Sequence, residues 1–299
     1  MIRFYVASAF LFCVNISFGQ SDMLAALEAE ADKEVAYIRA TWKSPVLINA
    51  YTTETERKGV LDFKISHRFG NVGGQSGWGH SLFGLDRASN IRYSFDYGVT
   101  EEFQIGIGRS KTNEHIDGLV KYKFLKQKKE STPITAVILS NTAFTPKKDL
   151  AENFSKIAHR FSFINQLIVG SKLNSRLSVL FSATHFHKNL VIQVANFSVP
   201  RDQYDLFSFG LGTRYKITRR LSLVGEYNHT LGELRNSSNF DYYHPFSCGI
   251  ELETGGHVFH INLSNSSGII FQDLLDTGVD SWTDGGFKLG FRISRFFIL

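Results

Sequence analysis

The sequence predicts an all-β protein, an antiparallel transmembrane β-barrel of about 12 strands with a short N-terminal helical extension. Apolar and polar side chains alternate in about a dozen segments after residue 59, and the chain begins with a secretory leader. The last segment shows the alternation plainly: its odd positions are apolar except for Arg295, and its even positions are Lys288, Gly290, Arg292 and Ser294. Because side chains alternate across a strand, one face would touch lipid and the other a polar, wet lumen.

A signal peptide is expected over residues 1–19. Arg3 supplies the positive start, residues 4–14 form a short apolar run, and Ser17 and Gly19 are small residues suited to a cleavage site. The run is too short to cross a bilayer as a helix, which needs ~20 apolar residues. The leader therefore indicates export to the outer membrane.

The composition fits a barrel better than a soluble enzyme. The chain has 27 Phe and 11 Tyr, yet no later segment has the length of a transmembrane helix. Lipid-facing residues of a barrel come one at a time, and aromatic residues gather at its rims. The formal net charge of +5 would favour nucleic acid in a soluble protein, but export makes a nucleic-acid partner unexpected. Cys248, the one cysteine beyond the leader, cannot form an internal disulfide.

Residues 20–58 differ from the rest and are assigned as an N-terminal helix and linker. Within 21–43, apolar residues recur at steps of three and four, acidic residues come early and basic residues late, as in a helix. Pro45 ends any such helix. The polar stretch 46–58 has no clear period, so it is either a linker or an insertion into the lumen. The helix is either a periplasmic lid or a docking helix for a periplasmic partner.

Residues 59–299 are assigned as the barrel domain. A period of two predicts strands over 60–69, 90–98, 102–110, 115–125, 133–143, 158–170, 176–186, 205–217, 220–229, 244–254, 256–265 and 286–298. Each is near the ~9–11 residues that a tilted strand needs to cross a membrane. The fifth is apolar on both faces, so its inward face is undetermined, and ten or fourteen strands stay open.

The connections between these strands alternate in length. Those after even-numbered strands are short, and those after odd-numbered strands are mostly long, with 111–114 as the exception. Outer-membrane barrels have short periplasmic turns and long extracellular loops, whereas a soluble β-sandwich has no reason for this alternation. Glycines on the polar face, such as Gly106, Gly108 and Gly290, suit a crowded lumen or the close approach of a plug.

The predicted lumen face carries more bases than acids. Ten bases lie on it: Lys64, Arg68, Arg92, Lys121, Lys123, Arg160, Arg214, Lys216, Lys288 and Arg292. Six acids lie on it: Asp62, Asp96, Asp117, Glu226, Glu251 and Glu253. A lumen filled by paired charges or by a plug is favoured, because buried charges need partners. The alternative is a narrow channel that prefers anions.

Catalytic and metal-binding patterns are weak, so no catalytic residue, metal site or cofactor is assigned. His185 and His187 lie on one strand face at the outer rim but have no obvious third ligand. His67 and His257 fall on the lipid face without a serine at a useful spacing, which leaves an outer-membrane enzyme as a second alternative. The aspartates of the last long loop match no calcium motif and indicate a soluble loop: Asp273, Asp276, Asp280 and Asp284.

Several segments resemble a known family. They are Ala-Thr-Trp-Lys-Ser at 40–44, Leu-Ile-Asn at 47–49, Gly-Val-Leu-Asp-Phe-Lys-Ile-Ser-His-Arg-Phe-Gly at 59–70, Leu-Phe-Gly-Leu-Asp at 82–86, Tyr-Gly-Val-Thr at 97–100 and Ile-Gly-Ile-Gly-Arg-Ser at 105–110. In this order they are similar to a family of Bacteroidota β-barrel proteins, domain of unknown function 5777. The likeness runs from about residue 40 to the C-terminus and is densest over 59–125. It implies an outer-membrane barrel, but it gives no activity, ligand or active-site residue that could be transferred to this chain.

The candidate luminal polar network joins charged residues of the lumen face to two residues of the family-like segments. It comprises Lys64, Arg68, Asp86, Arg92, Asp96, Arg109, Asp117, Lys121, Arg214, Glu226, Glu251 and Arg292. The expected role is structural or transport-related, without enzyme activity. The expected partners are outer-membrane lipid, the barrel-assembly machinery and a periplasmic protein that would bind residues 21–43.

Overall fold

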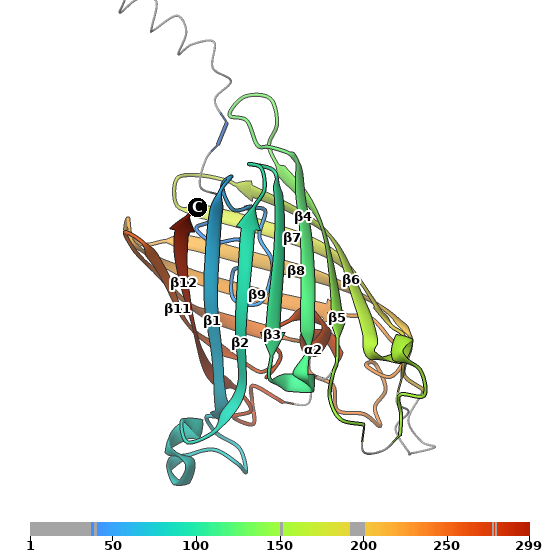
Figure 1. The fold of residues 1–299 in the computed structure, drawn as a ribbon. Coiled ribbons are helices and arrows are strands. Elements are labelled where there is room, and N and C mark those ends of the chain that lie inside the picture. The colour runs from blue at the N-terminus through green and yellow to red at the C-terminus, as the bar shows by residue number, and fades with distance from the viewer. Residues whose placement is uncertain (1–36, 39–40, 150–151, 192–200, 277, 279) are drawn as a thin grey trace, which may run out of the picture.

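The protein folds into a closed barrel of antiparallel strands (Figure 1). The structure, a computed structural model, describes residues 37–38, 41–149, 152–191, 201–276, 278 and 280–299. Each strand pairs with its neighbours in sequence, and β1 pairs with β12 to close the barrel. The expected helix over 21–43 lies for the most part outside the described residues.

The strands confirm the predicted pattern, and each begins and ends within three residues of its expected bounds. They are β1 (Val60–Asn71), β2 (Ala88–Gly98), β3 (Phe103–Ser110), β4 (Ile116–Leu125), β5 (Thr135–Phe144), β6 (Phe161–Lys172), β7 (Leu177–Lys188), β8 (Asp205–Lys216), β9 (Leu221–Thr230), β10 (Phe246–Thr254), β11 (His257–Ser264) and β12 (Lys288–Ile298). The largest difference is at β6, because a 3₁₀ turn, η3 (Ile157–Arg160), occupies the predicted start.

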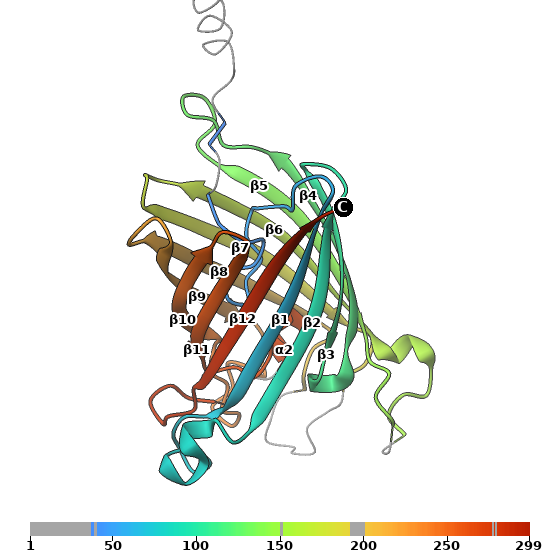
Figure 2. The same cartoon turned by 60° about the vertical axis from the view of Figure 1, so that its left-hand side comes forward.

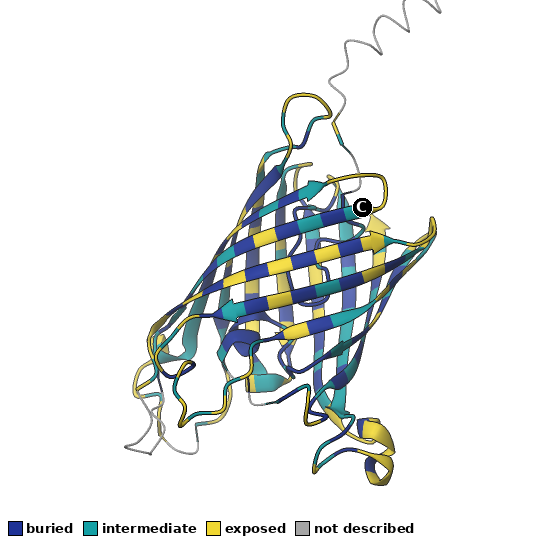
Figure 3. Ribbon diagram, turned by 180° about the vertical axis from the view of Figure 1, so that it is seen from behind, coloured by how far each residue is buried: buried dark blue, intermediate teal, exposed yellow. Residues whose placement is uncertain are grey.

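Burial alternates along the strands as the period of two requires (Figure 3). Outward side chains are apolar and exposed, for example Ile107, Leu211 and Ile261, which are 58%, 59% and 51% exposed. Inward side chains are buried, including charged ones such as Lys64 and Arg292. An exposed apolar wall around a polar interior is the reverse of a soluble barrel and suits hydrocarbon outside.

The two ends of the barrel differ (Figures 1 and 2). The C-terminus and the short turns lie at one end, and the long loops lie at the other, with η1 (Gly79–Gly84) and η2 (Thr112–Glu114) among them. Since short turns are periplasmic in outer-membrane barrels, the long loops are extracellular.

No helix among the described residues is long and apolar enough to span a bilayer.

Two segments lie inside the barrel (Figures 1 and 2). Residues 41–58, here the N-terminal plug, occupy the lumen from the periplasmic side. Residues 266–276, here the loop plug, belong to the β11–β12 loop, and their last six residues form the short helix α2 (Phe271–Asp276). The polar stretch 46–58 is therefore an insertion into the lumen and not a linker.

The lumen is not polar throughout, and in this respect the sequence-based expectation is wrong. One buried apolar cluster includes Val137 and Leu139 of β5, Ile164 of β6, and Phe271 and Leu274 of the loop plug. The apolar inward face of β5 packs against α2, which explains why β5 reads as apolar on both sides. Its inward residues are Thr135, Val137, Leu139, Asn141 and Ala143.

Candidate functional site: a lumen closed by two plugs

The N-terminal plug begins as a tight hairpin. Val46 and Tyr51 form an antiparallel bridge, and Leu47 N donates to Ala50 O at 2.7 Å. The arms are held by Thr52 Oγ1, which donates to the carbonyl of Ser44 at 2.7 Å. The tip, residues 47–50, is buried in the barrel. A buried tip needs partners for its peptide groups, because strands of the wall are already paired with each other.

Glu226 of β9 supplies the acceptor for the hairpin tip. Its carboxylate accepts hydrogen bonds from Ile48 N at 3.2 Å, Asn49 N at 3.0 Å and Ala50 N at 2.9 Å. Asn49 Nδ2 adds a fourth donor at 2.6 Å. Successive N–H groups that converge on one anion form an anion-binding nest, so the charge of Glu226 is stabilised by the hairpin backbone.

Arginine and lysine side chains supply the donors for the hairpin carbonyls. Arg292 of β12 donates to Val46 O at 2.6 Å, Leu47 O at 2.8 Å and Ile48 O at 3.0 Å. Lys121 of β4 donates to Pro45 O at 3.3 Å and to Glu54 O. The excess of bases over acids on the lumen face therefore has a use: these cations bind backbone oxygens of the plug, not carboxylates.

The two plugs contact each other inside the barrel. Arg68 of β1 donates to Asn49 Oδ1 of the hairpin at 3.0 Å and to Ser266 O of the loop plug at 2.6 Å. The rings of Tyr51 and Phe271 stack with centroids 6.0 Å apart. Each plug therefore forms part of the binding surface for the other, and displacement of one exposes apolar surface on its partner.

Ion pairs fasten the loop plug and its flanks to the wall. Asp276 pairs with Lys188 of β7 at 2.6 Å, and Asp280 pairs with Lys288 of β12 at 2.6 Å. Asp273 is buried and accepts from Asn113 Nδ2 at 2.8 Å. The expectation of a merely soluble loop is wrong for these aspartates, because α2 turns inward and its acids meet luminal and rim donors. In the described residues no group of side chains is suited to hold a metal ion.

A cluster of carboxyl groups lies where the N-terminal plug connects to β1. Lys64 Nζ lies 2.8 Å from Asp62, 2.6 Å from Asp96 and 4.0 Å from Glu56 of the plug. One ammonium faces three buried carboxyls, so a proton on one of them relieves the repulsion. Burial raises the pKa of Glu56 to about 8; Lys64 acts against this, and Asp62 and Asp96 raise it further.

The barrel should therefore lose stability as the pH rises from about 4.5 to about 8. In that range folded Glu56 keeps a proton that the unfolded chain has released, so folding takes up protons and is opposed by high pH. Above about pH 8 this contribution is constant. Glu56→Gln should flatten the slope, measured as the urea midpoint at several pH values in detergent. An unchanged slope in Glu56→Gln would contradict the assignment.

The structure places ten of the twelve residues of the candidate network in the lumen. Those buried there are Lys64, Arg68, Arg92, Asp96, Asp117, Lys121, Arg214, Glu226, Glu251 and Arg292. Arg92 forms a two-point pair with Asp117, and Arg214 Nε lies 2.7 Å from Glu251.

Asp86 and Arg109 lie outside the lumen. Asp86 is exposed in the loop after η1, and Arg109 points outward on β3, where it pairs with Glu114 at 3.3 Å. Arg109 has the same odd position along β3 as the outward residues Ile105 and Ile107, so the period of two already predicted that it faces outward. Its place in a family-like segment led to the wrong assignment to the lumen.

Several luminal residues escaped sequence reasoning. Asn49 contacts Glu226, Arg68 and Ser247, and His260 lies 3.0 Å from Arg292. His260 shares the inward parity of β11, so the period of two could have found it. Asn49 lies in a segment with no period, and its one signal was the family-like segment at 47–49.

Residues 42–297 match the family described as the membrane-bound β-barrel domain, domain of unknown function 5777. The chain belongs to this family. The match begins at Trp42, so it takes in nearly the whole N-terminal plug together with all twelve strands. Transmembrane β-barrels are proteins of outer membranes, and this family member is an outer-membrane β-barrel.

Among solved structures, porins and channels are similar to this chain at low sequence identity. The NanC porin is 11% identical with a TM-score of 0.48, covering 80% of this chain and 99% of the porin. An outer membrane channel from Pseudomonas putida F1 is 15% identical with a TM-score of 0.47, over 82% and 98% of the two chains. The KdgM porin is 8% identical with a TM-score of 0.44, over 80% and 99%. None of the curated proteins matches the sequence significantly.

Proposed function

We propose that this protein is a transport-related barrel of the outer membrane that is closed by its own N-terminal and loop plugs and opens when the N-terminal plug is displaced. The observation that carries the proposal is the clamp on the hairpin tip. Glu226 and Arg292 bind the backbone of residues 46–50 through charge-assisted hydrogen bonds. Water can replace such bonds, so the wall around this hairpin stays wettable when the hairpin leaves.

A barrel with a purely structural role has a simpler way to fill its lumen. Apolar packing would suffice, such as that between the inward side chains of β5 and α2. The N-terminal plug packs apolar residues such as Trp42 and Leu47 against the wall, but its tip is also bound by the charged side chains of Glu226 and Arg292, and it enters from the periplasmic side. A periplasmic partner that binds residues 21–43 would reach this plug directly. We also propose that residues 1–19 are a signal peptide that is removed on export, and that the protein comes from a member of the Bacteroidota.

The proposal assigns no catalytic activity. The lipid-facing histidines of the enzyme alternative are part of the aromatic wall: His67 packs against Phe69 and Phe291 with ring centroids 4.4 and 5.4 Å apart. His257 packs against Phe259 at 5.8 Å. These contacts support a packing role for both rings at the membrane surface.

A reversible lock tests the proposal. Asn49 Nδ2 lies 3.1 Å from Ser247 Oγ, so Asn49→Cys with Ser247→Cys, in a Cys248→Ala background, puts one thiol on the hairpin tip and one on β10 within reach of a short bis-methanethiosulfonate cross-linker, which bonds each thiol through a reducible disulfide. In planar bilayers the wild type should show no steady conductance but brief openings when urea loosens the plug. The cross-linked double variant should lose these openings and regain them with reductant. A steady open pore in the wild type, or openings that survive the lock, would refute the mechanism.

A further inference from the structure

A groove crosses the outer wall of the barrel, where Ser140, Asn165 and His185 lie among apolar side chains. It has a volume of about 470 Å³ and lies over β4 to β8. Ser140 and Ala183 form its floor, and Tyr122, Phe207 and Phe209 are among its larger walls. Ala183 pairs with Phe209 across β7 and β8, so a small residue sits directly beside a large one. The step between them leaves a trough that an alkyl chain can fill.

Polar atoms line this trough without full partners. Ser140 Oγ and Asn165 Oδ1 are 3.0 Å apart on adjacent strands. Among the described residues, the side-chain amide of Asn165 makes this one hydrogen bond. Whichever way the amide is turned, one of its two ends keeps no protein partner. A polar group that faces hydrocarbon without a partner is costly, so the site suits a ligand with its own donor or acceptor at this depth.

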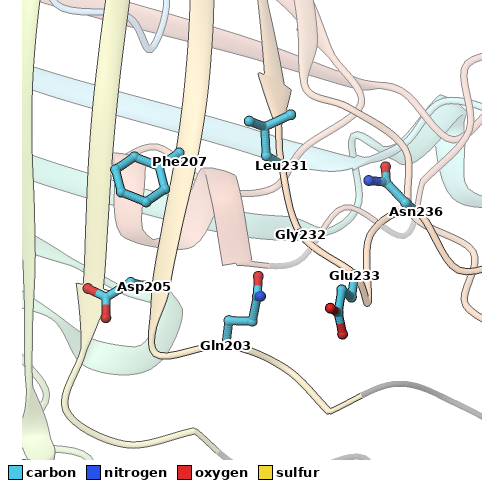
Figure 4. A pocket seen from close by; sticks show the side chains of 7 residues that line it. All are labelled: Gln203, Asp205, Phe207, Leu231, Gly232, Glu233 and Asn236. Carbon is cyan, nitrogen blue, oxygen red and sulfur yellow. The ribbon is translucent and has the colours of Figure 1, made fainter.

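The groove adjoins a pocket at the extracellular rim (Figure 4), and Phe207 lines both. His185 lines the groove, and its Nε2 lies 2.8 Å from Oδ1 of Asp205, which lines the rim pocket. The rim pocket has a volume of about 690 Å³. A polar pocket and an apolar trough thus lie next to each other, as the head and tail of one lipid would require.

The chemistry of the rim pocket selects the head group. Gln203, Asp205, Glu233 and Asn236 present amides and carboxylates, and no lysine or arginine lines the pocket among the described residues. Oδ1 of Asp205 already meets His185 Nε2 and His187 Nδ1, each at 2.8 Å, so Glu233 is the carboxylate that faces the pocket without these partners. A carboxylate repels a phosphate, whereas amides and carboxylates together bind hydroxyl groups well. The exposed ring of Phe207 offers an apolar face beside them.

We infer that this outer face binds a glycolipid, with an uncharged sugar in the rim pocket and an acyl chain in the trough over Ser140 and Ala183. The linkage carbonyl of the lipid would meet the free end of the Asn165 amide. The site is on the lipid side of the wall, and the residues that line it do not hold the tip of the N-terminal plug. Its failure would therefore leave the proposed transport role unaffected, and the conductance experiment would not detect it.

Native mass spectrometry of the whole barrel tests this site. The protein is released from micelles doped equally with a monogalactosyl diacylglycerol, a phosphatidylglycerol and a diacylglycerol. The wild type should retain the galactolipid about tenfold over each of the others, equivalent to about one or two good hydrogen bonds. Gln203→Ala with Glu233→Ala should bring galactolipid and diacylglycerol to parity. Ala183→Phe should reduce retention of all three lipids by filling the trough.

Ile261→Phe is the matched control, because Ile261 is an exposed outward residue of β11, a strand that does not line the groove. It adds a ring to the lipid face and should leave retention unchanged. Folding of every variant is checked by the heat-dependent shift of the barrel on gels. Equal retention of the three lipids by the wild type, or a preference for phosphatidylglycerol, would overturn the inference. So would a dimer that Ala183→Phe abolishes, since a second copy would then occupy the groove.

Discussion

Removal of residues 41–58 should convert a closed barrel into a conducting one. The hairpin tip is buried against Glu226 and Arg292. The strands of the wall pair with one another around the barrel, and the segment 41–58 adds to this pairing at its join with β1, where Lys58 bridges to Gly98 and Val60 N donates to Arg57 O. The deletion joins residue 40 to residue 59 and leaves the barrel sequence intact. Single-channel recording in planar bilayers should show steady conductance in the deletion protein and none in the wild type. Further deletion of residues 269–276, which includes α2, should increase the conductance.

The opened pore should prefer anions. Without the N-terminal plug, Arg292 and Lys121 lose the carbonyl oxygens that they bind, and Arg68 loses its bond to Asn49. These three residues are bases, and Glu226, which binds the hairpin tip, is an acid, so their release leaves behind more positive than negative charge. Unpaired positive charges in a narrow pore concentrate anions. The reversal potential in a salt gradient measures this preference, and Lys121→Gln with Arg292→Gln should remove it.

A deletion of residues 79–86 is the control for this experiment. It shortens the loop that contains η1, which lies at the extracellular end away from the lumen (Figure 1). That protein should stay closed. A deletion of 41–58 that folds and inserts but conducts nothing would mean that the loop plug and the wall close the lumen by themselves, and the gating role of the hairpin would be withdrawn.

Glu226→Ala should cause the largest loss of stability of any single substitution on the lumen face. The change removes one buried carboxylate and leaves the N–H groups of Ile48, Asn49 and Ala50 without an acceptor. Removal of one member of a buried, charged hydrogen-bond set costs about 3–5 kcal/mol. Urea unfolding of the barrel in micelles, followed by tryptophan fluorescence, measures the loss, because Trp42 is buried in the plug.

Glu253→Ala is the matched control. Glu253 pairs with Lys43 of the same plug at 2.7 Å, but its side chain is 35% exposed. A partly exposed ion pair contributes about 0–1 kcal/mol, so this variant should unfold close to the wild type. Glu226→Gln keeps one acceptor oxygen and should lie between the two. Similar losses for Glu226→Ala and Glu253→Ala would show that the hairpin tip is not held by Glu226.

The barrel could be predicted from sequence because its physics is local. A strand that separates lipid from lumen must alternate, and the strands of this chain other than β5 show the alternation, which also placed residues such as Arg214 and Glu251 inside. β5 defeated the same rule, because both its faces meet apolar surroundings: lipid at Ile138 and α2 at Val137.

The filling of the lumen could not be predicted, because it depends on contacts between residues far apart in sequence. Asn49 and Glu226 are 177 positions apart, and nothing in either neighbourhood indicates the other. The hairpin has no period, since its peptide groups are satisfied by side chains of the wall and not by a ladder. The excess of bases could be seen in the sequence. The backbone carbonyls that these bases bind could not, because every residue has one and none of them is charged.

The position of the hairpin also bears on how the molecule assembles. It lies in the chain shortly before β1, and Arg292 on β12 binds its carbonyls, so it is tied to both strands of the seam where the first and last strands join. Closure of this seam therefore leaves the hairpin inside, and a cylinder of strands that is complete already has an occupied interior.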